Sequence, residues 1–149
     1  MASEFDELQE HIMADMRRTY TDTVIDHAMN PRNAGSMPNA DGFGSVTGPC
    51  GDTMEIWLRV KEGKVVNATF WTDGCGTTIA AGSMVTELTK GIRATEALGI
   101  TQQEVLDALG GLPEESVHCA LLAANTLREA VRDYLNTRKE PWKRAYRKR

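Results

Sequence analysis

The sequence contains little cysteine, which limits how its thiols can be used. Its 149 residues include three cysteines, and three thiols cannot all pair with one another. A disulfide-stabilised scaffold is therefore not expected, and reduced thiols in a cytoplasmic protein fit better. The chain also lacks the paired CxxC spacing that marks many structural zinc sites, so spacing alone identifies no metal site.

Long apolar runs and basic stripes are missing too. No stretch approaches the ~20 apolar residues that a membrane span needs, and the acidic start MASEFDELQEH resembles neither a secretory signal nor a transit peptide. The net charge is −4, and the body of the chain is acidic, which predicts that nucleic acid is not a partner. Residues 138–149 carry seven basic residues and one acidic residue, and we expect them to form a solvated basic tail.

The length of 149 residues predicts one domain. Its first part has a helical pattern, with Ser3 as the N-cap and apolar residues at helical spacing as far as Ala28. The helix should end at Asn30-Pro31, because proline pushes the preceding residue out of the α region. The two histidines of this helix, His11 and His27, are interpreted as surface residues.

Two later segments alternate apolar and polar side chains, the pattern of half-buried strands. They cover residues 53–60 and 66–70, with Lys61-Glu62-Gly63 between them, and a further short strand is expected near residues 43–47. We expect a three-residue hairpin loop, because a two-residue loop would set polar residues of one strand against apolar residues of the other. This register opposes Leu58 with Val66, Ile56 with Ala68 and Met54 with Phe70.

The open end of this predicted hairpin brings two cysteines together. The register sets Asp52 opposite Thr72 and Cys50 opposite Gly74, and Cys75 is the next residue. Cross-strand neighbours lie ~5 Å apart, so both thiols should converge on one small volume. The glycines that flank them keep bulky side chains away and permit tight turns.

The remainder of the chain has the pattern of helices. Residues 77–90 place small and apolar side chains on one stripe, and Thr95 and Thr101 each resemble an N-cap followed by glutamate. Ser116 is expected to open a long final helix. The first turn of that helix contains His118-Cys119, and a helix N-terminus favours the thiolate form of cysteine.

The candidate site consists of Cys50, Asp52, Cys75, His118 and Cys119. Three soft thiolates suit zinc or an iron–sulfur cluster, and the aspartate or the histidine can complete a fourth position. Two alternatives stay open on these residues alone. Free cysteines also pack as small apolar side chains, and a Cys–His pair can act as a nucleophile, although consecutive helical residues point about 100° apart.

Four segments follow one another along the chain: VIDHAMNPRNAG, GPCGDTMEIWLRV, ATFWTDGCGTTIAAGSMVTELTKG and VHCALLAANTLREAVRDY. Together they resemble the iron–sulfur cluster assembly scaffolds of the IscU/NifU N-terminal family, from about Tyr20 to Leu135. The related SufU type has an insertion between the second and third cysteines and lacks the histidine. This chain has His118 and no such insertion, so it is more similar to the IscU type.

The resemblance implies a compact α+β fold, a small antiparallel three-stranded sheet with helices packed on one face. Residues 1–149 would form one such domain, with residues 1–19 as a helical extension and residues 138–149 as the basic tail. The resemblance also makes Cys50, Cys75 and Cys119 the cluster-binding cysteines. Asp52 and His118 lie beside them as candidates for the fourth ligand.

The implied function is that of an assembly scaffold and cluster carrier, not of an enzyme. Cys119 would accept persulfide sulfur from a cysteine desulfurase, and iron would join it with electrons from ferredoxin or another donor. The resulting labile [2Fe–2S] cluster would pass to apo-proteins. The same pocket suits zinc, so a zinc-binding module is the alternative, and a homodimer that shares one cluster is left open.

One stretch departs from the family pattern. The family's LPPVK stretch, where a DnaK-type chaperone docks, reads Leu112-Pro113-Glu114-Glu115-Ser116 in this chain. Two acidic residues and a serine replace its last three positions, and a chaperone of this type is therefore a doubtful partner.

Overall fold

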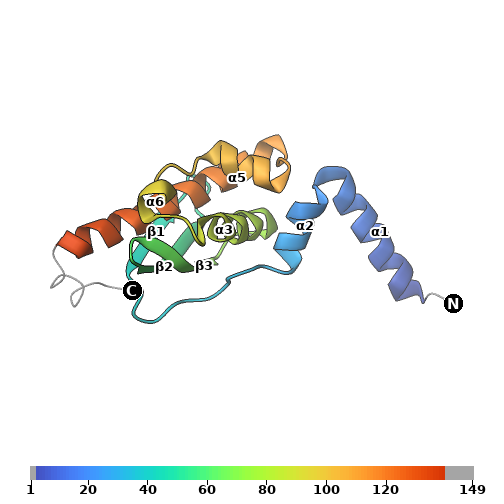
Figure 1. The fold of residues 1–149 in the computed structure, drawn as a ribbon. Helices are drawn as coiled ribbons and strands as arrows, with labels where there is room; N and C mark the ends of the chain where they lie inside the picture. Colours follow the sequence, from blue (N-terminus) through green and yellow to red (C-terminus); the bar gives the residue numbers. More distant parts are fainter. Residues whose placement is uncertain (1–2, 140–149) are drawn as a thin grey trace.

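The structure, a computed structural model, describes residues 3–139 and has an α+β architecture. A three-stranded antiparallel sheet in the order β1-β2-β3 is covered by helices on one face, and the first helix stands away from this body (Figure 1). The elements are α1 (Glu4–Thr19), α2 (Asp22–Met29), β1 (Gly42–Thr47), β2 (Thr53–Lys61), β3 (Lys64–Thr72), α3 (Gly76–Thr89), α4 (Ala94–Ala97), α5 (Gln102–Leu109), the 3-10 helix η1 (Glu114–Ser116) and α6 (Val117–Lys139). The expected fold class is confirmed. None of the helices in this described range combines the length and the apolar character that crossing a membrane requires.

The main core forms between the sheet and the helices α3 and α6. Alternate side chains of β2 point to the helical face, so Met54, Ile56 and Leu58 are fully buried there. Helix α6 packs across β1 and β2, and α3 packs on β3. On the opposite face, a smaller buried cluster contains Met37 from the loop before β1 and Trp57 from β2.

Glycines allow these two helices to approach the sheet closely. A Cβ atom placed on Gly44 of β1 would lie 2.5 Å from the backbone nitrogen of Ala130 on α6. One placed on Gly82 of α3 would lie 2.5 Å from a ring carbon of Phe70 on β3. Both distances are well below van der Waals contact, so neither position has room for a side chain, and each helix lies directly against its strand.

The hairpin between β2 and β3 corrects the expected register. Its loop has two residues, Glu62 and Gly63, with φ angles of 53° and 79°, as a type I′ turn requires. The strands pair directly from this turn until a bulge between Arg59 and Val60, where Val66 is the extra residue on β3. The prediction of a three-residue loop was wrong because a two-residue turn matches the twist of the strands. The bulge then brings the apolar residues of β3 opposite those of β2. Val66 is consequently exposed instead of buried.

The shifted register also changes the open end of the hairpin. Met54 lies opposite Thr72 instead of Phe70. If this pairing is continued beyond the end of β2, Asp52 lies opposite Gly74. A Cβ atom added to Gly74 would lie 2.8 Å from Oδ2 of Asp52, so the two residues are in contact. The predicted pairing of Asp52 with Thr72 was therefore wrong by two residues.

The N-terminal segment forms two helices instead of the single one expected. Ser3 caps α1 with a capping box, but α1 ends at Thr19. Thr21 then caps α2 by accepting a hydrogen bond from the backbone N–H of Val24, and its hydroxyl donates to the carbonyl of Leu109 on α5. No residue of α1 is buried, which agrees with its position outside the core (Figure 1).

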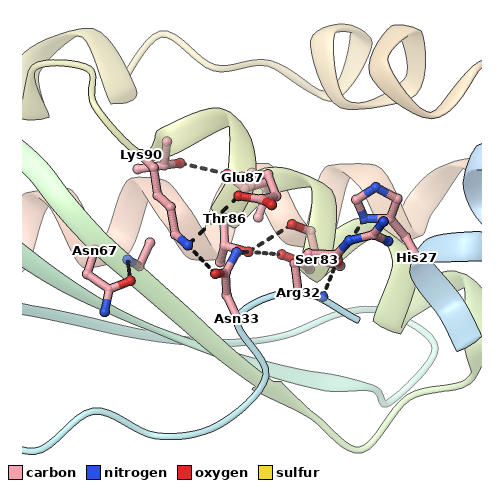
Figure 2. A network of polar contacts seen from close by, with 12 residues as sticks. His27, Arg32, Asn33, Asn67, Ser83, Thr86, Glu87 and Lys90 are labelled. Atoms are coloured by element: carbon pink, nitrogen blue, oxygen red, sulfur yellow. Dashed lines mark hydrogen bonds and ion pairs between the residues drawn. The ribbon is translucent and has the colours of Figure 1, made fainter. Parts of the chain in front are cut away.

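The segment Asn30-Pro31-Arg32-Asn33 fastens the end of α2 to α3 and to the outer edge of β3 (Figure 2). The side chain of Asn33 donates to Oγ1 of Thr86 at 3.1 Å and accepts from the ammonium group of Lys90. Its backbone carbonyl accepts the N–H of Phe70 at 3.0 Å. This short segment therefore occupies part of the strand edge that the sheet would otherwise leave open.

His27 is buried, so its interpretation as a surface residue was wrong. The Ser83 hydroxyl accepts the backbone N–H of Arg32 at 2.9 Å and lies within hydrogen-bond distance of Nδ1 of His27, at 2.7 Å (Figure 2). Burial is the main cause that lowers the pKa of His27, and the charge of Arg32 adds to it. The carboxylates of Asp26 and Glu87 oppose this shift.

The remaining helix starts follow the sequence prediction only in part. Thr101 caps α5 as expected, but Thr95 lies inside α4, whose N-cap is Arg93. The final helix starts directly after Ser116. The basic tail lies outside the described residues from position 140 onward.

We predict that His27 makes the fold less stable as the pH is lowered. The unfolded chain takes up a proton at the ordinary histidine pKa of about 6.5, whereas the folded chain resists it, so stability is lost as the pH falls through that value. Urea denaturation at several pH values should show a smaller loss in His27→Gln than in the wild type. His11→Gln, on the exposed surface of α1, serves as the control and should behave as the wild type. Equal pH dependence in the wild type and His27→Gln would contradict the prediction.

Candidate functional site

The five predicted residues lie on three segments that meet at one end of the sheet. The loop between β1 and β2 provides Cys50 and Asp52, Cys75 is the N-cap of α3, and His118 and Cys119 lie in the first turn of α6. Two helices therefore begin at the site. Their unpaired N–H groups and positive dipole ends create an environment that favours negatively charged groups.

The loop between β1 and β2 is a tight turn that presents Cys50. The backbone N–H of Gly48 donates to the carbonyl of Asp52 at 2.8 Å, and that of Gly51 donates to the carbonyl of Gly48 at 3.0 Å. Gly51 has a φ of 91°, a conformation that L side chains rarely adopt. Cys50 is exposed on this turn. It does not lie opposite Gly74 as predicted, because the shifted register brings Asp52 to that glycine.

The other two cysteines differ in exposure. Cys75 is exposed, whereas the side chain of Cys119 is 2% exposed. Nε2 of His118 lies 3.8 Å from Sγ of Cys119. The two residues are consecutive on one helix, where side chains point about 100° apart, and the sulfur is buried, which together argue against the thiol-enzyme alternative.

Two buried threonine hydroxyls connect the sulfur atoms. Oγ1 of Thr77 lies 3.2 Å from Sγ of Cys75 and 3.5 Å from Sγ of Cys119. Oγ1 of Thr78 lies 3.4 Å from Sγ of Cys119 and 3.8 Å from Sγ of Cys75. The Thr78 hydroxyl also donates to Oδ2 of Asp52 at 3.1 Å. Two thiols, two hydroxyls and a carboxylate thus form one compact cluster.

The Thr77 hydroxyl also changes the acid–base behaviour of Cys75. Its hydrogen bond is the main cause that lowers the pKa of the Cys75 thiol. The backbone N–H groups of Thr77 and Thr78 act in the same direction, and partial burial of the sulfur opposes them. Since the thiolate is the form that binds metals and attacks sulfur, this environment prepares Cys75 for either reaction.

The donors lie near one another without forming a closed metal site. Within residues 3–139, no three side chains of histidine, cysteine, aspartate or glutamate are arranged so that they could hold one metal ion. The chemistry of the donor set nevertheless fits a soft metal or an iron–sulfur cluster, because it offers three thiols with a carboxylate and an imidazole nearby.

An apolar cavity of about 220 Å³ opens beside Cys75. Its lining includes Met16 of α1, Val24 of α2 and Ser116 before α6. This cavity gives Cys75 an apolar border on the side of the N-terminal helices.

Sequence reasoning missed two residues of the site, Thr77 and Thr78. A signal was present, because two consecutive threonines follow a Gly-Cys-Gly at the start of a helix. The second and third residues after an N-cap lie in the first turn, where their side chains can reach back to the cap. Threonine is also an ordinary residue at such positions, so the pattern alone did not single out these hydroxyls.

Comparisons with known proteins identify the family of the chain. The family model of the NifU-like N terminal domain matches residues 19–141. The chain is 49% identical over 116 residues to iron–sulfur cluster assembly scaffold protein IscU 1 of Archaeoglobus fulgidus, with 77% of this chain and 76% of that protein covered. It is 42% identical over 124 residues to the scaffold protein IscU of Escherichia coli K12, with 80% of this chain and 96% of that protein covered.

Solved structures support the fold. The N-terminal part of a nitrogen-fixing NifU-like protein from Brucella abortus matches with a TM-score of 0.63 at 18% identity, over 78% of this chain and 94% of that one. A putative scaffold protein for the SUF system from Fervidobacterium islandicum matches with a TM-score of 0.61 at 20% identity, over 75% of this chain and 96% of that one. The family model and the two scaffold relatives together show that the chain belongs to the NifU-like N terminal domain family, among its IscU-type members.

Proposed function

We propose that this chain is a scaffold on which an iron–sulfur cluster is assembled and from which it passes to apo-proteins. The observation that supports this most is the placement of the three cysteines on one loop and two helix starts that meet at a single site, with Asp52 among them. The curated relatives named above are themselves assembly scaffold proteins. Such a protein binds and passes on its product and does not turn over a substrate.

Sulfur would arrive as a persulfide from a cysteine desulfurase in the reducing cytoplasm. The thiolate of Cys119 attacks the outer sulfur of that persulfide, the sulfur–sulfur bond on the donor breaks, and the donor cysteine leaves as a thiolate. Cys119 lies in the first turn of α6, where its sulfur contacts the hydroxyls of Thr77 and Thr78 at the start of α3. Because Cys119 is only 2% exposed, the donor has to displace neighbouring side chains to reach it.

Iron and electrons would then complete a [2Fe–2S] cluster. Each transferred sulfur needs two electrons to become sulfide, so two sulfurs need four. Two ferrous ions supply two of them as they become ferric, and ferredoxin or another electron donor supplies the remaining two. Cys50, Cys75 and Cys119 bind the iron, and either Asp52 or His118 fills the fourth position.

Asp52 gives this site a way to release its cluster. A carboxylate is a harder and weaker partner for cluster iron than a thiolate, and it exchanges readily for water or an incoming ligand. The contact between Asp52 and Thr78 keeps the carboxylate within the same group of side chains as Cys75 and Cys119. A site with four thiolates would instead retain its cluster.

The first prediction for this site concerns the cysteines. We expect Cys50→Ala, Cys75→Ala and Cys119→Ser each to abolish stable cluster binding, because a chain with three cysteines has no spare thiolate. Anaerobic addition of ferrous iron and sulfide, followed by visible absorption, measures this. The wild type should turn red-brown, whereas a dedicated zinc module would not. A variant that keeps the wild-type absorbance per protomer would refute the three-cysteine site.

The second prediction concerns Asp52. We expect Asp52→Ala to retain a cluster and to lose it to a chelator roughly fivefold more slowly, which corresponds to about 1 kcal/mol in the barrier. Transfer to an apo-ferredoxin should slow as well. Glu114→Ala, which removes an exposed carboxylate just before α6, is the matched control. Faster loss than in the wild type, or no cluster at all, would make Asp52 a required ligand.

A third prediction concerns the acidic stretch before α6. Glu114 and Glu115 are exposed in the position of the family's chaperone motif, and we expect little ATP-dependent acceleration of cluster transfer by a DnaK/DnaJ-type pair. The variant that combines Glu114→Pro, Glu115→Val and Ser116→Lys restores the family motif and should gain such acceleration. Strong acceleration of the wild-type protein would show that the acidic stretch still docks the chaperone.

A further inference from the structure

We infer that Thr78 is a positioning residue, which holds the Asp52 carboxylate beside the sulfurs of Cys75 and Cys119 before any metal ion binds. The inference rests on the proposed function, because it assigns a task to a residue of the same site. Thr78 is fully buried in the first turn of α3, and its hydroxyl is the group that links the carboxylate to the thiols.

The direction of the hydrogen bonds defines the role of this hydroxyl. Thr78 donates its single proton to Oδ2 of Asp52 at 3.1 Å. With that proton engaged, the oxygen of Thr78 lies 3.4 Å from Sγ of Cys119 and 3.8 Å from Sγ of Cys75. The carboxylate thus fixes the orientation of the hydroxyl, and the hydroxyl ties the carboxylate to helix α3.

The turn before α3 leaves space for this contact because residue 74 is a glycine. A Cβ atom on Gly74 would lie 2.7 Å from Cβ of Thr78 and 2.8 Å from Oδ2 of Asp52. Any side chain at this position would therefore push Asp52 and Thr78 apart. Three segments, the β1–β2 loop, the turn after β3 and the start of α3, together make the contact.

Thr77 provides the comparison within the same site. Its hydroxyl lies 3.2 Å from Sγ of Cys75 and 3.5 Å from Sγ of Cys119, but its hydrogen bonds go to these sulfurs and not to Asp52. Thr77 is buried as well. The two neighbouring threonines therefore contact the same sulfurs, while Thr78 alone of the pair holds the carboxylate.

Asp52 needs such a partner because its own backbone does not fix its side chain. It follows the exposed turn at Cys50 and Gly51, and water competes for its carboxylate. A ligand that is already held near its target loses less conformational freedom when it binds. Without the Thr78 hydroxyl, Asp52 should turn to solvent, and Thr78→Val should then behave as Asp52→Ala.

The experiment compares the full chain with Thr78→Val, Thr78→Ser, Asp52→Ala and the double variant Thr78→Val/Asp52→Ala. After anaerobic reconstitution, loss of visible absorption under a chelator is followed. Thr78→Val should lose its cluster as slowly as Asp52→Ala, the double variant should be no slower than either, and Thr78→Ser should match the wild type. In a Thr77→Val background, Asp52→Ala should still slow the loss by the same factor. Effects of Thr78→Val and Asp52→Ala that multiply in the double variant would overturn the inference.

A second measurement does not require a cluster. Cobalt(II) alone is added to the metal-free proteins, and its visible ligand-field bands report the atoms that bind it. Asp52→Ala should change this spectrum, Thr78→Val should change it in the same way, and Thr78→Ser should restore the wild-type bands. A wild-type spectrum in Thr78→Val, or in Asp52→Ala, would overturn the inference.

These outcomes separate the inference from the proposed function. A wild-type chain that forms no cluster with iron and sulfide would defeat the scaffold function, while the cobalt spectra would still decide whether Thr78 positions Asp52. A wild type that forms a cluster, with a Thr78→Val variant indistinguishable from it, would defeat the inference alone. Should Thr78→Val fail to fold, as judged by circular dichroism, Thr78→Ala against Thr78→Ser makes the same comparison.

Discussion

The close packing of α3 and α6 on the sheet is the constraint on which the site depends. Gly82 lets α3 lie on Phe70, and Gly44 lets α6 lie on β1, so each helix has a fixed height and direction above the sheet. Because helices are stiff, fixing them along their length also fixes their first turns. The positions of Cys75 and Cys119 are therefore determined by packing some distance away, with no need for a bond between the thiols themselves.

Inside that rigid frame, the contacts among the functional groups are weak and exchangeable. The separations between hydroxyl oxygens and sulfurs, from 3.2 to 3.8 Å, are those of modest hydrogen bonds. Such contacts keep the side chains in order and still give way to a stronger ligand. The turn that presents Cys50 is exposed, whereas Cys119 in the first turn of α6 is buried.

The sequence predicted the kinds of elements better than their alignment. Alternating side chains revealed the strands because one face of each is buried, but residues 65 and 66 are both valine, so the sequence did not show that Val65 is the buried one and Val66 the extra residue of a bulge. Helical spacing continues across Tyr20, which hid the break between α1 and α2. Burial of His27 depends on a serine 56 positions away, and no local pattern shows such a partner. The cysteines could be named because they are few and match a family pattern, whereas Thr78 could be found only from its neighbours in space.

The bulge in the β2–β3 hairpin connects the geometry of the hairpin turn with that of the functional site. The turn at Glu62 and Gly63 lies at one end of the hairpin, and Asp52 and Gly74 meet beyond the other. Beyond the bulge the strands pair without a further shift as far as Met54 and Thr72, so the meeting of Asp52 with Gly74 depends on Val66 being the extra residue. The number of residues between the turn and Gly74 therefore sets which residues meet at the site. Near the turn, the hairpin should tolerate substitutions more readily than insertions or deletions.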